Sequence, residues 1–255
     1  MPMLRAADLD VHYIEAGDAH GVPVLFVHGN WGSASWWEPL LARLPARYRG
    51  IAYDVRGRGE TTGPDSSYAI DALAADLLAF ATAVGAERFH LVGHSLGTAI
   101  AMQAALDAPE RVRSLAVIAP AWVDGMPAAY AVPAGQVAIK NDAALFATAL
   151  KPLAPSAPDD DYWKRLVREG HGQRIEAALR NIDALLAWAP GDRLAAIPGP
   201  KIVIAGALDP LTGGANAERA AAALGARLVT LDGVGHSPNI EAPDRVAALL
   251  AELWG

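Results

Sequence analysis

The sequence predicts an α/β fold: a mainly parallel, doubly wound sheet interrupted by an all-helical insertion. Short apolar segments that resemble buried strands alternate with segments of helical periodicity up to residue 121, and the alternation resumes after residue 190. Between these points, residues 122–190 contain no segment with a clear strand pattern. We therefore expect a core built from residues 1–121 and 191–255, with residues 122–190 inserted as a helical lid.

Composition and charge restrict the classes of protein to which this chain can belong. The 255 residues are 53% hydrophobic, which is enough to bury one large core. The net charge is −7 and no basic run occurs, so we expect no nucleic acid partner. The absence of cysteine excludes disulfides and thiolate nucleophiles. Because neither a secretion signal nor a long apolar run is seen, we expect a cytoplasmic protein without a membrane span.

Seven segments have the composition of strands. The first alternates apolar and polar residues, as a half-buried antiparallel strand does, and the others are short apolar runs typical of parallel strands. His12 in the first segment is expected to be exposed, and Asp54 and Arg56, which follow the third, are expected to have structural roles. The expected strands cover residues 9–16, 24–27, 51–53, 89–92, 114–119, 201–205 and 227–231.

Helices are expected between these strands and throughout the insertion. Residues 69–84 carry apolar side chains at helical spacing along one face, and Gly85 fits the C-terminal end of that helix. The other helices expected in the core cover residues 36–44, 98–106, 215–224 and 242–254. Helices expected in the insertion cover residues 136–150, 160–169 and 174–188, separated by proline-rich joints.

The segment at residues 89–98 is the clearest candidate for a catalytic site. An apolar strand ends in Gly-His-Ser-Leu-Gly at residues 93–97, and a helix of small apolar residues follows. Strand, tight turn and helix are the context that the Gly-x-Ser-x-Gly nucleophile elbow requires. The turn strains the central residue and exposes its side chain, and flanking glycines leave room for the backbone. We therefore expect Ser95 to be a nucleophile.

Two further loops at the same end of the sheet contain the partners that a serine nucleophile needs. Asp209 follows the strand at residues 201–205, and His236 follows the strand at residues 227–231. A hydroxyl is a poor nucleophile until a base takes its proton, and neutral imidazole suits neutral pH. A carboxylate fixes the imidazole tautomer and stabilises the imidazolium that forms. Ser95, Asp209 and His236 are therefore the expected catalytic residues.

With these motifs in this order, the chain resembles the α/β-hydrolase superfamily, in which the nucleophile, the acid and the histidine occur in that order. The resemblance covers nearly the full length and implies an α/β-hydrolase sheet with a helical lid, but it does not specify a substrate. It rests on His28-Gly29, Asp54-x-Arg56-Gly57-x-Gly59, Gly93-His94-Ser95-Leu96-Gly97, Gly206-Ala207-Leu208-Asp209 and Gly235-His236.

The resemblance also implies roles for residues around the catalytic three. The backbone N–H groups of Asn30 and Leu96 would form the oxyanion hole, because these residues follow the His-Gly motif and the nucleophile. His28 matches a position that buttresses the oxyanion loop, and His94 matches a packed neighbour of the nucleophile.

Rivals for the acid are Asp124 and Asp232. Asp124 follows the strand after the elbow, where some members of the superfamily place their acid. Asp232 lies too near His236 on the same loop. We favour Asp209 over both.

Two departures from the pattern of the superfamily matter. Many relatives have a second glycine after Gly97, where this chain has Thr98, whose hydroxyl would lie near the elbow. The loop at residues 28–31 resembles that of haloalkane dehalogenases, in which the asparagine helps to hold halide. Those enzymes need an aspartate nucleophile, so serine at position 95 disfavours dehalogenation, and epoxide hydrolysis is disfavoured on the same ground.

The expected activity is hydrolysis of a small or medium carboxylic ester, or of a lactone or thioester, through an acyl-enzyme on Ser95. The expected partner is a small-molecule substrate, no metal or organic cofactor is expected, and the oligomeric state is not predicted. Apolar residues expected to line the substrate pocket are Trp31, Trp122, Met126, Phe146 and Trp188.

Other functions remain open at this point. Cofactor-free perhydrolases of the haloperoxidase type and hydrolases of carbon–carbon bonds use the same three residues on the same fold. A function of another class, a small-molecule receptor or signalling hydrolase, would show very slow turnover together with tight binding that alters the lid.

Overall fold

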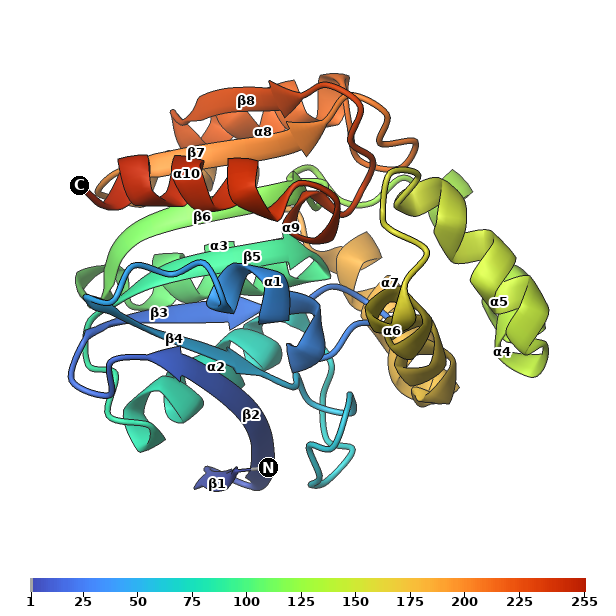
Figure 1. The fold of residues 1–255 in the computed structure, drawn as a ribbon, viewed down its shortest axis with the longest axis horizontal. Helices are drawn as coiled ribbons and strands as arrows, with labels where there is room; N and C mark the ends of the chain where they lie inside the picture. The colour runs from blue at the N-terminus through green and yellow to red at the C-terminus, as the bar shows by residue number, and fades with distance from the viewer. Residues whose placement is uncertain (1) are drawn as a thin grey trace.

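A computed structural model describes residues 2–255. Its centre is a sheet of eight strands in the order β1-β2-β4-β3-β5-β6-β7-β8 (Figure 1). β2 pairs antiparallel with β1 and β4, and all other pairs are parallel. The strands are β1 (Met3–Ala6), β2 (Leu9–Gly17), β3 (Val22–Val27), β4 (Tyr48–Tyr53), β5 (Phe89–Ser95), β6 (Val112–Pro120), β7 (Lys201–Gly206) and β8 (Arg227–Leu231).

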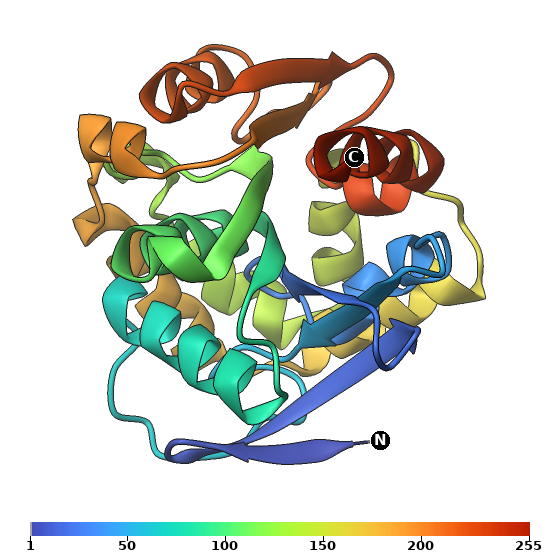
Figure 2. The same cartoon turned by 90° about the vertical axis from the view of Figure 1, so that its left-hand side faces the viewer.

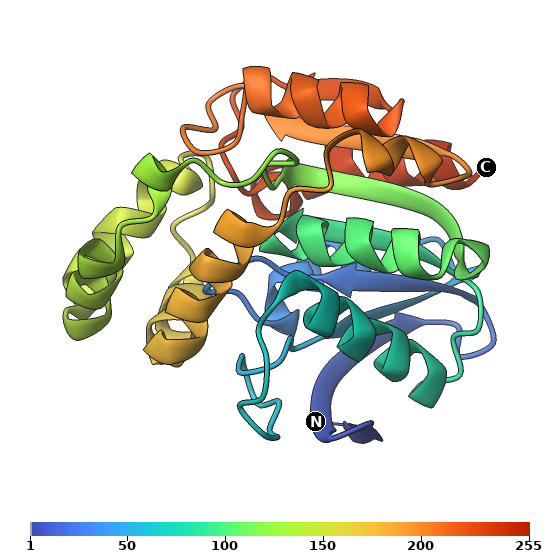
Figure 3. The same cartoon turned by 180° about the vertical axis from the view of Figure 1, so that it is seen from behind.

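Helices cover both faces of this sheet, as Figures 2 and 3 show. Along β3, Leu25 and Val27 belong to one buried cluster and Val24 and Phe26 to another, because successive side chains of a strand point to opposite faces. Burial on both faces explains the continuous apolar sequences of the parallel strands. One face is covered by α2 (Ile70–Ala83), α3 (Leu96–Asp107) and α8 (Ala215–Leu224), and the other by α1 (Glu38–Leu41), α9 (Pro238–Glu241) and α10 (Pro243–Trp254).

The predicted fold class is confirmed, and every expected strand is present. β4 begins at Tyr48 rather than at Ile51, because pairing with β2 on one side and β3 on the other keeps Arg49 and Gly50 in the ladder. The edge strand β1 is not among the predicted strands, since four residues are too few for an alternating pattern to be recognised. It turns into β2 through Ala7, whose φ is 51°.

Residues 122–190, here called the insertion, contain no strand and lie beyond the carboxyl ends of the parallel strands (Figure 1). The single helix expected at residues 136–150 is two helices, because Asp142 is extended and its carboxylate caps the second one. None of the helices described is long and apolar enough to span a membrane. The insertion contains α4 (Pro133–Asn141), α5 (Ala143–Leu150), α6 (Asp161–Gly172) and α7 (Ile175–Ala187).

His12 on β2 corrects one expectation. The sequence predicts an exposed residue, but only 4% of its surface is accessible, because its ring lies against Asp54 just after β4. His12 Nδ1 is 2.6 Å from Asp54 Oδ2. The same carboxylate accepts hydrogen bonds from the backbone N–H groups of Ala34 (2.6 Å) and Glu60 (2.9 Å). Asp54 thus joins β2, the segment after β3 and the loop after β4.

Arg56 in the same loop forms a buried ion pair with α2. Its guanidinium donates to both carboxylate oxygens of Asp76, each at 2.7 Å. Asp76 lies off the apolar face of its helix, yet it is buried because this pair encloses it. The contacts of Asp54 and Arg56 therefore fix the loop at residues 54–60 against the core.

We predict that the stability difference between the wild type and His12→Gln is larger at about pH 6 than at about pH 9. The hydrogen bond to Asp54 raises the pKa of His12 above its ordinary value of 6.5, although burial opposes the rise. Stability from a raised pKa is present in full below the unfolded-state pKa and is lost as the pH rises through the folded-state pKa. Urea unfolding across this range measures the difference, and a difference that grows with pH contradicts the prediction.

Candidate active site

Ser95 lies at the turn between β5 and α3, where the backbone is strained. Its φ of 52° and ψ of −122° lie outside the regions that residues with a Cβ favour. A Cβ on Gly93 would be 2.5 Å from the Gly97 carbonyl oxygen, and a Cβ on Gly97 would be 2.1 Å from the Val27 carbonyl oxygen. Because these neighbours are backbone atoms, both glycines of the Gly-x-Ser-x-Gly motif are a steric requirement.

Thr98, the departure from the usual second glycine, joins the elbow to the next strand. Its hydroxyl donates to the Ser95 carbonyl oxygen (2.6 Å) and accepts from the Ala121 N–H (2.8 Å). The side chain is fully buried. Thr98 therefore ties the strained peptide of Ser95 to the segment that follows β6.

Ser95, His236 and Asp209 form one hydrogen-bonded chain across three loops. His236 Nε2 lies 2.9 Å from Ser95 Oγ, and His236 Nδ1 lies 2.9 Å from Asp209 Oδ2. Asp209 follows β7 and His236 follows β8, so all three residues lie at the carboxyl ends of parallel strands, where α/β sheets bind ligands. The Asp209 side chain has no accessible surface. Neither Asp209 nor His236 could have been paired with Ser95 by local sequence alone.

Donors that the sequence analysis missed hold Asp209 in its ionised form. The carboxylate accepts from the N–H groups of Leu211 (2.8 Å) and Thr212 (3.0 Å) and from the Thr212 hydroxyl (2.9 Å). Burial raises the pKa of Asp209, but the hydrogen bond and charge of His236 and these N–H groups outweigh it, so the pKa lies well below its ordinary value. The available signal was the Asp-Pro step at residues 209–210, which favours a turn closed by the aspartate.

The rival acids lie on the exposed surface of the molecule. Both carboxylate oxygens of Asp124 accept from the Arg219 guanidinium at 2.8 Å on the exposed surface. Asp232 is exposed, and its carbonyl oxygen accepts from Arg245 (3.0 Å). The carboxylate beside His236 is that of Asp209.

The loop from His28 to Trp31 packs against the elbow. A Cβ on Gly29 would lie 3.0 Å from the Ser95 Cβ, so a larger residue would press on the serine. Fully buried His28 accepts from the Val55 N–H at Nε2 (3.0 Å) and donates from Nδ1 to the Gly29 carbonyl oxygen (2.8 Å). Burial lowers the pKa of His28 to about 4, so the neutral ring can make both contacts. His28 thus supports the loop from below.

The two residues expected to form the oxyanion hole adjoin Ser95. Leu96 is the first residue of α3, so its N–H has no acceptor within the helix. Asn30 lines the same cavity as Ser95, and its side chain is fixed by partners on both sides. Asn30 Oδ1 accepts from Arg58 and from Asn181 (3.4 Å), and Nδ2 donates to the backbone of α7 (3.3 Å). The assignment of the two N–H groups to an oxyanion hole stays a prediction.

His94, inside the elbow, packs behind His236. Its ring stacks on Trp36 with 5.9 Å between centroids, and its Nε2 donates to the His236 carbonyl oxygen (2.8 Å). Burial, assisted by the neighbouring His236 ring, lowers the pKa of His94 to about 3. A ring that stays neutral to such a low pH is a poor proton acceptor, so His94 supports the backbone of His236.

A cavity of about 160 Å³ lies over Ser95, between the sheet and the insertion. Three of the residues expected in the substrate pocket, Trp31, Trp122 and Met126, line it, and their contact with a substrate stays a prediction. The wall is mainly apolar. It also includes Trp36, Leu150, Leu153, Trp163, Ile182 and Leu185.

Phe146 and Trp188 do not line this cavity, contrary to expectation. Phe146 is fully buried inside the insertion, where its ring lies edge-on to Trp31 with 5.4 Å between centroids. The Trp188 indole N–H donates to the Gln103 side chain on α3 (3.1 Å), so this ring joins the insertion to the core. Phe146 therefore packs the interior of the insertion and Trp188 attaches the insertion to the core, roles that the sequence pattern does not separate from pocket lining.

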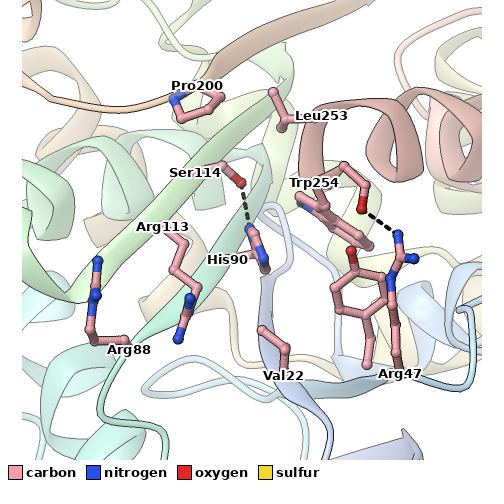
Figure 4. Close-up of a pocket in the computed structure, with 11 residues that line it drawn as sticks. Val22, Arg47, Arg88, His90, Arg113, Ser114, Pro200, Leu253 and Trp254 are labelled. Atoms are coloured by element: carbon pink, nitrogen blue, oxygen red, sulfur yellow. Dashed lines mark hydrogen bonds between the residues drawn. The ribbon is translucent and has the colours of Figure 1, made fainter.

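A second serine–histidine pair lies in another cavity, of about 510 Å³, at the amino ends of the strands (Figure 4). There His90 Nδ1 is 2.8 Å from Ser114 Oγ, and the lining includes Arg47, Arg88 and Arg113. Burial and the charge of Arg113 lower the pKa of His90 to about 4, which makes it a weak base. Ser114 lies within β6 rather than at a strained turn. The pair at Ser95 has the carboxylate partner and the turn geometry that this pair lacks.

Comparisons with known proteins bear on the family of this chain. The model of the Alpha/beta hydrolase family matches residues 24–249. A protein of Agrobacterium fabrum, provisionally named carbamate hydrolase RutD, is 32% identical over 238 residues, covering 89% of this chain and 90% of that protein. The protein of the same name from Variovorax paradoxus is 45% identical over 116 residues, which span 45% of this chain and only 43% of that protein.

A solved structure is similar to this chain over nearly its whole length. The structure described as Est816, an N-acyl homoserine lactone degrading enzyme, has a TM-score of 0.81 at 27% identity and covers 98% of this chain and 99% of that chain. The family model thus matches a chain whose sheet is mainly parallel. On that sheet the strained Ser95 turn comes first along the chain, followed by Asp209 and then His236. This chain belongs to the Alpha/beta hydrolase family.

Proposed function

We propose that the protein is a serine hydrolase that cleaves a small carboxylic ester through an acyl-enzyme on Ser95. The observation that carries the proposal is the hydrogen-bonded chain from Ser95 through His236 to Asp209, with Ser95 held at a φ of 52°. In such a chain the histidine is the base that takes the proton of the serine hydroxyl, and the aspartate fixes the tautomer of the histidine ring. In this proposal Ser95 is the nucleophile, His236 the base and Asp209 the acid.

The reaction follows from these positions. As Ser95 Oγ attacks the ester carbonyl carbon, His236 Nε2 takes the hydroxyl proton, and the carbonyl oxygen becomes an oxyanion facing the N–H groups of Asn30 and Leu96. The carbon–oxygen bond then breaks, and His236 gives the proton to the leaving alcohol. Water repeats the sequence on the acyl-enzyme and releases the carboxylic acid. Asp209 stays ionised throughout and stabilises the imidazolium of His236.

Cavity size and lining support a small, largely apolar substrate. At about 160 Å³ the cavity is well below the volume of sites that enclose drug-sized ligands.

We assign residues 122–190 the role of a lid over a core of residues 1–121 and 191–255. Two contacts support this assignment: His236 N–H donates to the Leu153 carbonyl oxygen (2.7 Å), and the Trp31 indole N–H donates to Gln136 (2.8 Å).

Carbamate or amide hydrolysis is the second candidate. It is favoured by the full-length similarity to the Agrobacterium fabrum protein provisionally named carbamate hydrolase. The same three residues serve both reactions, but an amine leaves poorly unless His236 protonates it, so leaving-group basicity separates the candidates.

Among residues 2–255 no cluster of three or more His, Asp or Glu side chains has an arrangement that could hold a metal ion. Cofactor-free hydrolysis itself stays a prediction.

We predict that the protein hydrolyses p-nitrophenyl esters with kcat/KM falling from acetate to octanoate, because the cavity is small. Ser95→Ala should lower kcat/KM by at least about 10³-fold, since the nucleophile is lost. Ser114→Ala, which removes the serine of the other serine–histidine pair, is the matched control and should retain activity. Full activity in Ser95→Ala would contradict the assignment. Faster turnover of N-ethylacetamide than of ethyl acetate, which share the acyl group and differ in the leaving group, would favour the second candidate.

The identity of the acid is tested by a pair of variants. We predict that Asp209→Asn lowers kcat by about 10⁴-fold, because the amide no longer stabilises the correct tautomer and the imidazolium of His236. Asp124→Asn should retain the wild-type kcat, since Asp124 pairs with Arg219 at the surface. Steady-state kinetics on p-nitrophenyl acetate measures both, and equal losses in the two variants would refute the choice of Asp209.

A further inference from the structure

Arg58 is a buried cation beside the oxyanion loop. It belongs to the loop after β4, and only 1% of its surface is accessible. Its guanidinium donates to the Asn30 side-chain oxygen and to the Arg174 carbonyl oxygen (3.3 Å), and it lies 5.7 Å from the centre of the Trp31 ring. Burial lowers the pKa of Arg58 to about 9. All the hydrogen-bond and ring partners that the described residues give this guanidinium are neutral.

These contacts join the oxyanion loop to the insertion. Arg174 immediately precedes α7. Asn181 on α7 donates to Asn30 Oδ1 at 3.4 Å, and Arg58 donates to the same oxygen. Asn30 Nδ2 completes the connection by donating to the Ala178 carbonyl oxygen on the same helix (3.3 Å). Both ends of the Asn30 amide are therefore held, one by Arg58 and α7 and the other by α7 alone.

The arrangement is poorly suited to stability. A buried charge without a carboxylate partner is destabilising, and replacing such groups by apolar ones of similar size is often neutral or stabilising. Within the described chain, Arg58 Nε and Asn181 Oδ1 are also buried without a hydrogen-bond partner, which adds to the cost. A network with these deficits beside a strained nucleophile indicates a functional rather than a structural reason for its presence.

We propose that Arg58 is a positioning residue for the oxyanion hole. This inference rests on the proposed acyl transfer at Ser95. By fixing the Asn30 side chain against docked α7, Arg58 fixes the peptide whose N–H faces the developing oxyanion. A displaced donor weakens binding of the transition state more than binding of the substrate, so the loss should appear in kcat rather than in KM. The links to α7 also make the alignment of Asn30 depend on a docked insertion.

The test compares Arg58→Met and Arg58→Lys with the wild type on p-nitrophenyl acetate. Arg58→Met should lower kcat by about 10- to 100-fold with KM changed less than about 3-fold, and its melting temperature should be unchanged or raised. Arg58→Lys retains a charge and one donor nitrogen, so it should recover part of the loss. Phenylboronic acid, which forms a tetrahedral adduct with serine, should bind the variants more weakly in proportion to kcat/KM.

Arg56→Lys is the matched control, because Arg56 lies in the same loop but pairs with Asp76 on α2. Because lysine keeps a cation beside Asp76 and so keeps the loop in place, this variant should lower the melting temperature and leave kcat unchanged. Unchanged kcat in both Arg58 variants, a loss confined to KM, or a kcat loss that follows melting temperature equally at Arg56 would each overturn the inference. If Arg58→Met does not fold, Arg58→Lys decides alone. A fluorophosphonate should label the wild type at Ser95 even if the inference about Arg58 is overturned. Failure of the proposed function itself would abolish this labelling.

Discussion

The left-handed backbone of Ser95 is the constraint around which the site is built. A φ of 52° at a residue with a Cβ is unfavourable and persists only where the surroundings enforce it. The enforcement comes from three sides. Gly93 and Gly97 allow the elbow to touch neighbouring backbone, Gly29 lets the adjacent loop approach the serine, and Thr98 binds the Ser95 carbonyl. The positive φ of Ser95 therefore accounts both for the tight packing around this turn and for the exposure of the hydroxyl.

Several buried histidines in this chain share one chemistry but differ in their partners, and the partners decide what each ring does. His28 and His94 are buried with backbone groups as their hydrogen-bond partners, so burial lowers their pKa values to about 4 and about 3, and the neutral rings hold the neighbouring backbone in place. His12 faces Asp54, and its pKa rises. His236 also faces a carboxylate, and its other nitrogen lies 2.9 Å from the Ser95 hydroxyl, so this ring connects the acid to the serine.

The fold and the three central residues could be predicted because their signals are local or strictly ordered. An apolar run that ends in Gly-x-Ser-x-Gly identifies its own structure, and the loops after later parallel strands must meet at the same edge of the sheet. Burial that depends on distant partners could not be predicted in this way. The alternation in β2 suggests an exposed His12, yet Asp54 lies 42 residues away along the chain and encloses it.

The same reason accounts for the remaining misses. Phe146 and Trp188 have the apolar character of pocket residues, but the packing of the insertion decides which aromatic ring faces the cavity. The contact of Thr212 with Asp209 differs from these, because it is made within a local turn that the Asp-Pro step at residues 209–210 favours. Arg58 gives no sign in the sequence of being buried, because arginine is usually a surface residue.

The hydrogen bond from His236 N–H to the carbonyl oxygen of Leu153 limits how freely the insertion can be exchanged. Leu153 ends the short turn Lys151–Leu153, so the loop that carries the histidine is anchored to a segment that an exchange of the insertion would remove. A chimera with a foreign insertion would leave the buried N–H of His236 without an acceptor unless the new segment offers a carbonyl at the same place. An unmet donor of this kind is destabilising by about 1–3 kcal/mol. Grafting a new specificity onto this core therefore has to preserve one backbone atom as well as reshape the apolar wall.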